Sequence, residues 1–159
     1  MLRILAGLIL VFSLGSVSVA ADLDKTVLTI SGKIGSESPI DLSIRQLKQL
    51  SGSSVSTSTP WHDGEVTFEG VLLSTLMNHV GATGQNADLV ALNEYRSTLP
   101  ISDFQEHRPL LAFLKDGSYM TIRDKGPLFV IYPFDDKPEL KTEVYFSRSV
   151  WQVRTIEIR

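Results

Sequence analysis

Short stretches of alternating apolar and polar residues run through most of the chain, and this alternation is typical of half-buried β-strands. Residues 128–132 form the most apolar run, which predicts a buried central strand. Lys115-Asp116-Gly117 indicates a tight turn, whereas Asn93-Glu94 indicates either a hairpin turn or a bent strand. The predicted strands cover residues 26–32, 53–59, 65–68, 88–92, 95–99, 109–114, 118–122, 128–132 and 150–158.

Apolar residues three or four positions apart predict two short helices. Residues 43–50 have this spacing, with Asp41 or Ser43 as the N-cap. Residues 71–79 have it as well, and Gly81 ends this second helix. Short strands interrupted by a few short helices predict an α+β domain built on a mixed β-sheet.

The N-terminal segment has the three features of a secretory signal peptide, namely a positively charged start, an apolar run at residues 4–14 and small residues after it. The apolar run is shorter than the roughly 20 residues of a membrane-spanning helix, although a retained membrane anchor is the alternative. We predict a signal peptide over residues 1–20, cleaved after Ala20 or Ala21. Residues 21–159 then form a single periplasmic domain that does not span the membrane.

The composition excludes several classes of function. The net charge is −3, with 15 basic and 18 acidic residues. Because no basic stripe accumulates, nothing predicts a nucleic-acid partner. The chain contains no cysteine. It therefore has no disulfide, no thiolate nucleophile and no soft metal ligand.

The common catalytic motifs do not occur in this sequence. There is no Gly-x-Ser-x-Gly elbow, no phosphate-binding glycine-rich loop and no His-x-x-x-His pair. The histidines are spread over different elements, and their spacing does not favour a three-histidine zinc site. His79 suits the C-terminal end of a helix, and His107 lies in a polar loop. Only His62, next to Trp61 in a turn, is a candidate site residue.

Arg123-Asp124-Lys125 leads directly into Gly126-Pro127 and the most apolar strand. A guanidinium fork beside a glycine, where the backbone allows close approach, suits an anionic or oxygen-rich ligand. The structural alternative is a charged turn in front of a core strand.

Aromatic residues beside polar turn residues point to a planar ligand. Trp61 stands next to a turn, and Tyr95 follows Asn93-Glu94. Flat rings stack on a heterocycle such as a pterin, and amide or carboxylate groups bond its edge. The alternative for each ring is core packing, which is the better interpretation of Trp151 in its alternating strand.

Five segments, in this order, resemble the molybdopterin-binding domain of the sulfite oxidase family, and the resemblance spans residues 26–159. Those enzymes bind molybdenum through a cysteine in a segment that corresponds roughly to residues 51–59, where this chain has only glycine, serine, valine and threonine. A hydroxyl is a poor substitute for that thiolate. The chain is also shorter than those enzymes. The matching segments are FEGVLLSTLMNHVGA, ALNEYRSTLPI, LLAFLKDGSYM, RDKGPLFVIYP and RSVWQVRTIEI.

The chain looks most similar to small exported members of this fold, which bind pterins in the periplasm and partner membrane-bound cyclic-di-GMP regulators. The resemblance implies a reduced or oxidised pterin as ligand, no molybdenum, no catalytic residues and the periplasmic part of such a regulator as partner. It also implies that Arg148 and Trp151 form the pocket floor or belong to the core. The pocket residues that it implies are Trp61, His62, Asn93, Glu94, Tyr95, Arg123, Lys125, Gly126, Pro127, Arg148 and Trp151.

Two other functions remain open from the sequence. One is an oxidoreductase that holds a molybdenum cofactor through the pterin dithiolene alone. The other is a protein-interaction module with a vestigial pocket, since a fold does not fix a function.

Overall fold

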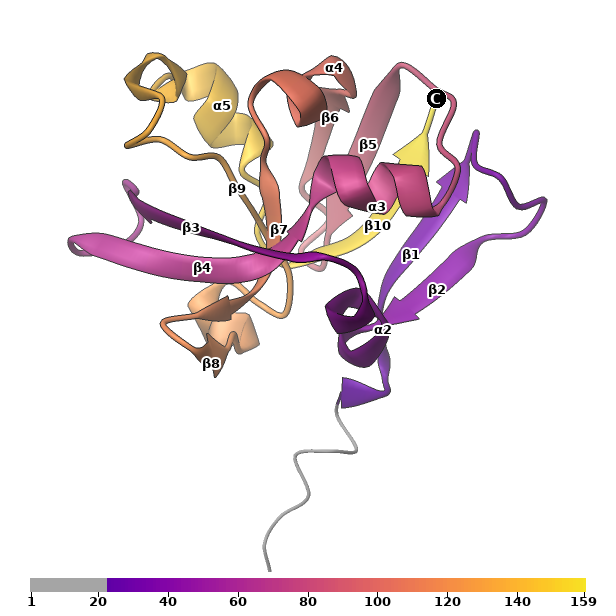
Figure 1. Cartoon of the computed structure of the whole chain (residues 1–159), viewed down its shortest axis with the longest axis horizontal. Coiled ribbons are helices and arrows are strands. Elements are labelled where there is room, and N and C mark those ends of the chain that lie inside the picture. Colours follow the sequence, from indigo (N-terminus) through magenta and orange to yellow (C-terminus); the bar gives the residue numbers. More distant parts are fainter. Residues whose placement is uncertain (1–22) are drawn as a thin grey trace, which may run out of the picture.

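The computed structural model describes residues 23–159, so the predicted signal peptide at residues 1–20 lies outside the described residues. Residues 23–159 form ten β-strands in two sheets, with four short α-helices. Figure 1 shows how the helices connect and flank the strands. This mixed architecture confirms the predicted α+β class. Within residues 23–159, no helix is both long enough and apolar enough to cross a membrane.

The first sheet brings the first and last strands of the described chain together at its centre. Its order is β2 (Ile40–Ser43), β1 (Thr26–Gly32), β10 (Val153–Ile158), β5 (Asn86–Ala91) and β6 (Arg96–Pro100). β1 and β10 run parallel, and the other neighbours run antiparallel. Because a parallel pair needs a long crossover, this sheet joins residues that are more than a hundred positions apart.

The second sheet has the order β3 (Gly52–Ser58), β4 (Glu65–Leu72), β7 (Leu110–Lys115) and β8 (Ser118–Tyr119), and β9 (Phe129–Ile131) also pairs with β7. All of β9 is buried, which confirms half of the prediction for residues 128–132. The strand is not central, however. It pairs with β7, and otherwise a single bridge joins Phe129 to Trp151.

The helices are α2 (Ile44–Gln49), α3 (Leu73–His79), α4 (Ser102–Glu106) and α5 (Glu143–Arg148), with 3-10 turns at Ile122–Asp124 and Pro138–Leu140. Ser43 is the N-cap of α2, as predicted. Its hydroxyl accepts a hydrogen bond from the backbone N–H of Gln46, while the Gln46 side chain accepts one from the backbone N–H of Ser43.

Several predicted boundaries are wrong, and strand pairing explains the clearest case. The strand predicted at residues 65–68 continues to Leu72, because Val71 and Leu72 pair with β7, and the helix predicted from residue 71 therefore begins two residues later. The strand predicted at residues 118–122 ends at Tyr119. The last strand begins at Val153, and β2, α4 and α5 lack a clear sequence signal.

The apolar core divides into two clusters. The larger one joins both sheets to α2 and α3, through residues such as Ile30, Leu76 and Leu89. The smaller one surrounds Phe68 and Phe129. The predicted site lies against the smaller cluster, because Trp61 and Trp151 pack on it as partly buried rings.

The pairing of β4 with β7 leaves no room for a side chain at Gly70, because a Cβ atom there would lie 2.1 Å from the carbonyl oxygen of Leu111. We expect Gly70→Ala to lower the free energy of unfolding by about 2 kcal/mol, since the strands must move apart. Gly52→Ala is the matched control, because its Cβ would meet nothing within 4 Å. Urea denaturation of the two variants tests this, and equal stabilities would contradict the close approach.

Asp135 ties the end of β3 to the loop after β9. Its carboxylate accepts hydrogen bonds from the backbone N–H of Ser58 at 2.6 Å, the hydroxyl of Ser58 at 2.7 Å and the Lys141 ammonium at 2.6 Å. Lys141 first, and then Ser58, lower the pKa of Asp135 to about 2. A carboxylate whose pKa falls on folding stabilises the native state above its unfolded pKa, near 4, and loses this effect as the pH falls through 2.

We therefore expect Asp135→Asn to lower the melting temperature at pH 7. The difference from the wild type should shrink below pH 4 and disappear at about pH 2. Thermal denaturation followed by circular dichroism at several pH values measures it. A difference that is the same at pH 7 and pH 2 would show that the charge of Asp135 is not the cause.

Candidate functional site

A small pocket of about 200 Å³ lies where α5, the turn between β5 and β6, and the turn after β3 meet. It contains four of the residues that the sequence predicted and four others. Its lining residues are Trp61, Asn93, Tyr95, Phe146, Ser147, Ser149, Val150 and Trp151.

Trp61 is the central ring of an aromatic cluster at this pocket. Its ring centroid lies 5.8 Å from each of the rings of Phe129, Phe146 and Trp151, in edge-to-face geometry. Such pairs contribute roughly 0.5–1.5 kcal/mol beyond their buried area. The turn is fixed by Thr59, whose hydroxyl oxygen accepts a hydrogen bond from the backbone N–H of Trp61 at 3.3 Å. The ring is thus held in place while one part stays exposed to the pocket.

Trp151 forms a second aromatic wall, and a cation covers one of its faces. The Lys125 ammonium lies 4.9 Å from the centroid of the Trp151 ring, within the range of a cation–π interaction. Lys125 adopts a left-handed backbone conformation, with φ of 69°, and its carbonyl accepts a hydrogen bond from the backbone N–H of Gln152 at 2.9 Å. The predicted basic loop therefore contacts Trp151 through Lys125, although Lys125 does not itself line the pocket.

The Asn93–Tyr95 segment forms a hairpin turn rather than a bent strand, because β5 and β6 pair antiparallel along their length. The Asn93 side-chain oxygen accepts a hydrogen bond from the backbone N–H of Tyr95 at 3.1 Å. The Tyr95 hydroxyl donates to the carbonyl of Ser147 at 2.9 Å, which connects this turn to α5. Two walls of the pocket are therefore linked by one side chain.

The polar groups in the pocket are few. The Ser147 and Ser149 hydroxyls donate to the carbonyls of Val144 and Tyr145, so their remaining capacity is to accept. The Asn93 amide offers N–H donors. This combination suits the edge of a small polar ring.

His62 does not line the pocket. Its Nδ1 lies 2.8 Å from the Thr59 hydroxyl, and its ring packs against Phe68 and Phe129 at 5.5 and 6.2 Å between centroids. Burial, and then the nearby charge of Lys125, lower the pKa of His62. The ring is therefore neutral near pH 7, and it packs on the Phe129 ring of the aromatic cluster without lining the pocket.

The remaining predicted residues lie outside the pocket. Glu94 forms surface ion pairs with Arg154 and Arg96 at 2.7 and 3.9 Å. Arg123 is exposed in a 3-10 turn. Gly126 is buried, with no room for a Cβ beside the carbonyl of Met120, and Pro127 faces a different groove.

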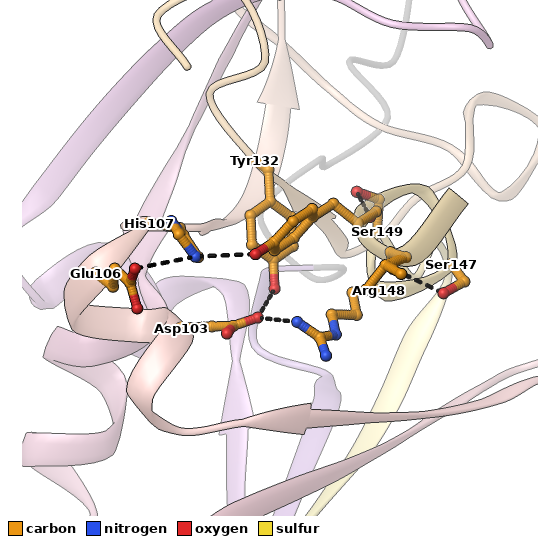
Figure 2. A network of polar contacts seen from close by, with 9 residues as sticks. Asp103, Glu106, His107, Tyr132, Ser147, Arg148 and Ser149 are labelled. Carbon is orange, nitrogen blue, oxygen red and sulfur yellow. Dashed lines mark hydrogen bonds and ion pairs between the residues drawn. The ribbon is translucent and has the colours of Figure 1, made fainter. Parts of the chain in front are cut away.

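Arg148 belongs to a buried ion pair rather than to the pocket floor (Figure 2). Its guanidinium donates to the Asp103 carboxylate at 2.8 Å, and the Tyr132 hydroxyl donates to the same oxygen at 3.0 Å. Burial and the charge of Asp103 raise the pKa of Tyr132 far above its ordinary value, so its proton stays in this bond. The network anchors α5, whose C-terminal part lines the pocket.

A second contact holds α5 from the end of α4 (Figure 2). His107 Nε2 lies 3.1 Å from the Tyr145 hydroxyl, and the two rings meet edge to face at 5.2 Å. His107 Nδ1 is buried and has no hydrogen-bond partner among the described residues. The predicted polar loop at residues 105–108 is thus partly the end of α4 and packs against α5.

Comparisons with protein-family models and with curated proteins gave no match. The chain is similar in structure to the sulfane dehydrogenase SoxCD from Paracoccus pantotrophus. The TM-score is 0.63 at 17% sequence identity, over 86% of this chain and 38% of the dehydrogenase chain. This likeness shows a shared fold and nothing finer, and the chain spans well under half the length of that enzyme chain.

The donor atoms near the pocket do not fit a molybdenum centre held by the protein. Most of the segment at residues 51–59 forms β3, and the hydroxyls of residues 56–59 make hydrogen bonds within the fold. Ser56 bonds to Thr67 at 2.8 Å, and Thr57 accepts from the backbone N–H of Asp135 at 3.0 Å. The chain has no cysteine, and residues 23–159 contain no cluster of three His, Cys, Asp or Glu residues that would hold a metal ion.

Four pocket residues, Phe146, Ser147, Ser149 and Val150, escaped the sequence interpretation. All belong to α5 or its C-terminal end, a helix of six residues without a clear apolar stripe. Their position directly before Trp151 was the available signal, because a residue next to a predicted site residue shares its surroundings.

Proposed function

We propose that this chain is an exported pterin-binding protein that senses its ligand for a membrane-bound signalling partner. The observation that carries the proposal is the pocket formed by Trp61, Trp151 and Tyr95, with the Asn93 amide at its edge. Flat rings around a small space with one amide suit a planar heterocycle that carries both donors and acceptors.

The size of the pocket supports a small ring system. Sites for drug-sized ligands have roughly 300–1,000 Å³, whereas this pocket has about 200 Å³. The bicyclic part of a pterin suits this volume, and a substituent on the ring would extend into solvent. Lys125, beside the Trp151 ring, would favour a polarisable or anionic substituent there.

The sensor role rests on the resemblance to small exported pterin-binding proteins and on the signal-peptide pattern. One structural feature agrees with it. Tyr95 and Val144 are exposed apolar side chains beside the pocket, on the hairpin turn and on α5. A partner that contacted them would touch two of the elements that close around the ligand. We propose the periplasmic part of a membrane-bound regulator, of the kind linked to cyclic-di-GMP, as this partner.

The likeness to a sulfane dehydrogenase favours one alternative, an oxidoreductase that holds a molybdenum cofactor through its dithiolene alone. Mass spectrometry and metal analysis of the chain purified from its native compartment distinguish the two. We expect a pterin at about one per chain and no matching amount of molybdenum. Stoichiometric molybdenum would overturn the proposal in favour of the oxidoreductase.

Tyr95→Phe should weaken pterin binding by about fivefold, because it keeps the ring but removes the hydrogen bond between the hairpin turn and α5. Tyr119→Phe is a control that also removes a tyrosine hydroxyl, one that bonds to Lys48 away from the pocket. Isothermal titration calorimetry measures both. If the two variants bind equally well, the Tyr95 hydroxyl does not support the site.

A further inference from the structure

A groove of about 650 Å³ is larger than the candidate pterin pocket and does not belong to it. It lies between the start of β1, the start of β10, the β7–β8 hairpin and the 3-10 turn Ile122–Asp124. Trp151 lines the small pocket and Val153 lines the groove, so a short segment separates the two. Its volume falls within the roughly 300–1,000 Å³ of typical ligand sites.

The walls of the groove are mainly apolar. Val27, Phe113, Met120 and Val153 contribute apolar side chains from four parts of the chain. Tyr119, which also lines the groove, is held by a hydrogen bond from the Lys48 ammonium of α2 at 2.9 Å. The groove is therefore a formed feature of the fold with an apolar interior.

Two large apolar side chains at the groove are unusually exposed. Ile122 is 61% exposed and Leu92 is 41% exposed. Gln152 is hydrogen-bonded to the backbone of both residues. Its side-chain amide donates to the carbonyl of Ile122 at 2.8 Å, and its backbone carbonyl accepts from the backbone N–H of Leu92 at 2.9 Å. Apolar groups fixed at the edge of an apolar cavity are typical of a binding surface.

The charged side chains that line the groove are positive. Its charged lining residues are Lys25 and Arg154, both exposed, and no carboxylate from residues 23–159 lines it. Arg154 bonds to Glu94 at 2.7 Å through one nitrogen, which leaves other N–H donors of its guanidinium. An apolar interior with two cations at its edge complements a molecule that has an apolar body and one anionic end.

We propose that this groove is a second ligand site, which binds an amphipathic anion with a single alkyl chain and a carboxylate or phosphate head. The alkyl chain of the ligand would lie against Val27 and Phe113. Its carboxylate or phosphate head would contact Lys25 and Arg154. Within residues 23–159, two aromatic side chains line the groove and four line the smaller pocket, so a pterin suits the smaller pocket better. The proposal is independent of pterin binding in the smaller pocket.

Calorimetric titration of the purified chain with decanoate and with decanol tests the proposal, since the two share an alkyl chain and differ in charge. We expect saturable binding of one decanoate per chain, about tenfold tighter than decanol. Val27→Trp should abolish the binding of both by filling the groove. In a double variant with Lys25→Gln and Arg154→Gln, the affinity for decanoate should fall to that for decanol, and the affinity for decanol should not change. Trp61→Ala, in the other pocket, should change neither.

Melting temperatures show whether each variant is folded. Val144→Gln, which changes an exposed apolar residue outside the groove, is the control for stability. The proposal is overturned if folded wild-type chain does not bind decanoate, or if Val27→Trp binds it as well as the wild type does. Binding to phosphatidylglycerol vesicles without binding to free decanoate would make this face a membrane surface instead. A dimer that Val27→Trp converts to a monomer would make it an interface between copies of the chain.

Discussion

Replacing Asp103 with alanine is expected to lower the free energy of unfolding by about 3 kcal/mol. The change leaves the Arg148 guanidinium without its partner at a position where the side chain is only 21% exposed. Removing one member of a buried ion pair typically costs roughly 3–5 kcal/mol, and partial exposure places this case at the lower end. The Tyr132 hydroxyl also loses its acceptor.

Urea denaturation of Asp103→Ala beside Asp136→Ala measures this effect. Asp136 is an exposed aspartate, so its replacement should change stability by less than about 0.5 kcal/mol. Because Arg148 ends α5, Asp103→Ala should also weaken pterin binding through the loosened pocket wall. Adding Arg148→Met to Asp103→Ala should restore part of the stability, since no unpaired charge then remains. A double variant less stable than Asp103→Ala would contradict this account of the network.

Trp61→Ala is expected to weaken pterin binding by about 10- to 100-fold. An aromatic ring that stacks on a planar base contributes roughly 1–3 kcal/mol when measured by alanine substitution. The ring also packs on Phe129, Phe146 and Trp151, so stability should fall by about 3 kcal/mol. Trp61→Phe separates the two effects, because it keeps a flat ring at the site.

Calorimetry at a temperature where all three chains are folded gives the affinities. We expect Trp61→Phe to bind with an affinity between those of the wild type and Trp61→Ala. Unchanged affinity in folded Trp61→Ala would place the ligand elsewhere, whatever the effect on stability.

The parts of the fold that the sequence predicted are those fixed by nearby residues. The alternation in β1 and the Ser43 cap of α2 depend on contacts within a few positions, and both are confirmed. The parallel pairing of β1 with β10 depends on residues such as Thr29 and Thr155, which are far apart in sequence. No local pattern encodes such a contact, so the order of the strands remained out of reach.

The candidate site also combines features that nearby residues determine with contacts between residues that are far apart in sequence. Trp61, Asn93 and Tyr95 were predicted because each lies in or beside a turn, where a ring or amide is free to face a ligand, and the structure brings these three residues together in one pocket. Arg148 shows the limit of this reasoning. The resemblance implied that Arg148 forms the pocket floor or belongs to the core, and in the structure its partner is Asp103, 45 positions away in sequence. A charged residue in one sequence does not reveal whether its partner is a ligand or a buried carboxylate.

Titration of the purified chain with reduced and oxidised pterins, followed by calorimetry, tests the proposed function most directly. We predict saturable binding of one pterin per chain with a dissociation constant in about the micromolar range or tighter. Trp61→Ala should weaken this binding, and Asp136→Ala should leave it unchanged. A folded chain that binds neither form of pterin would contradict the account and would favour an interaction module that has kept only the fold.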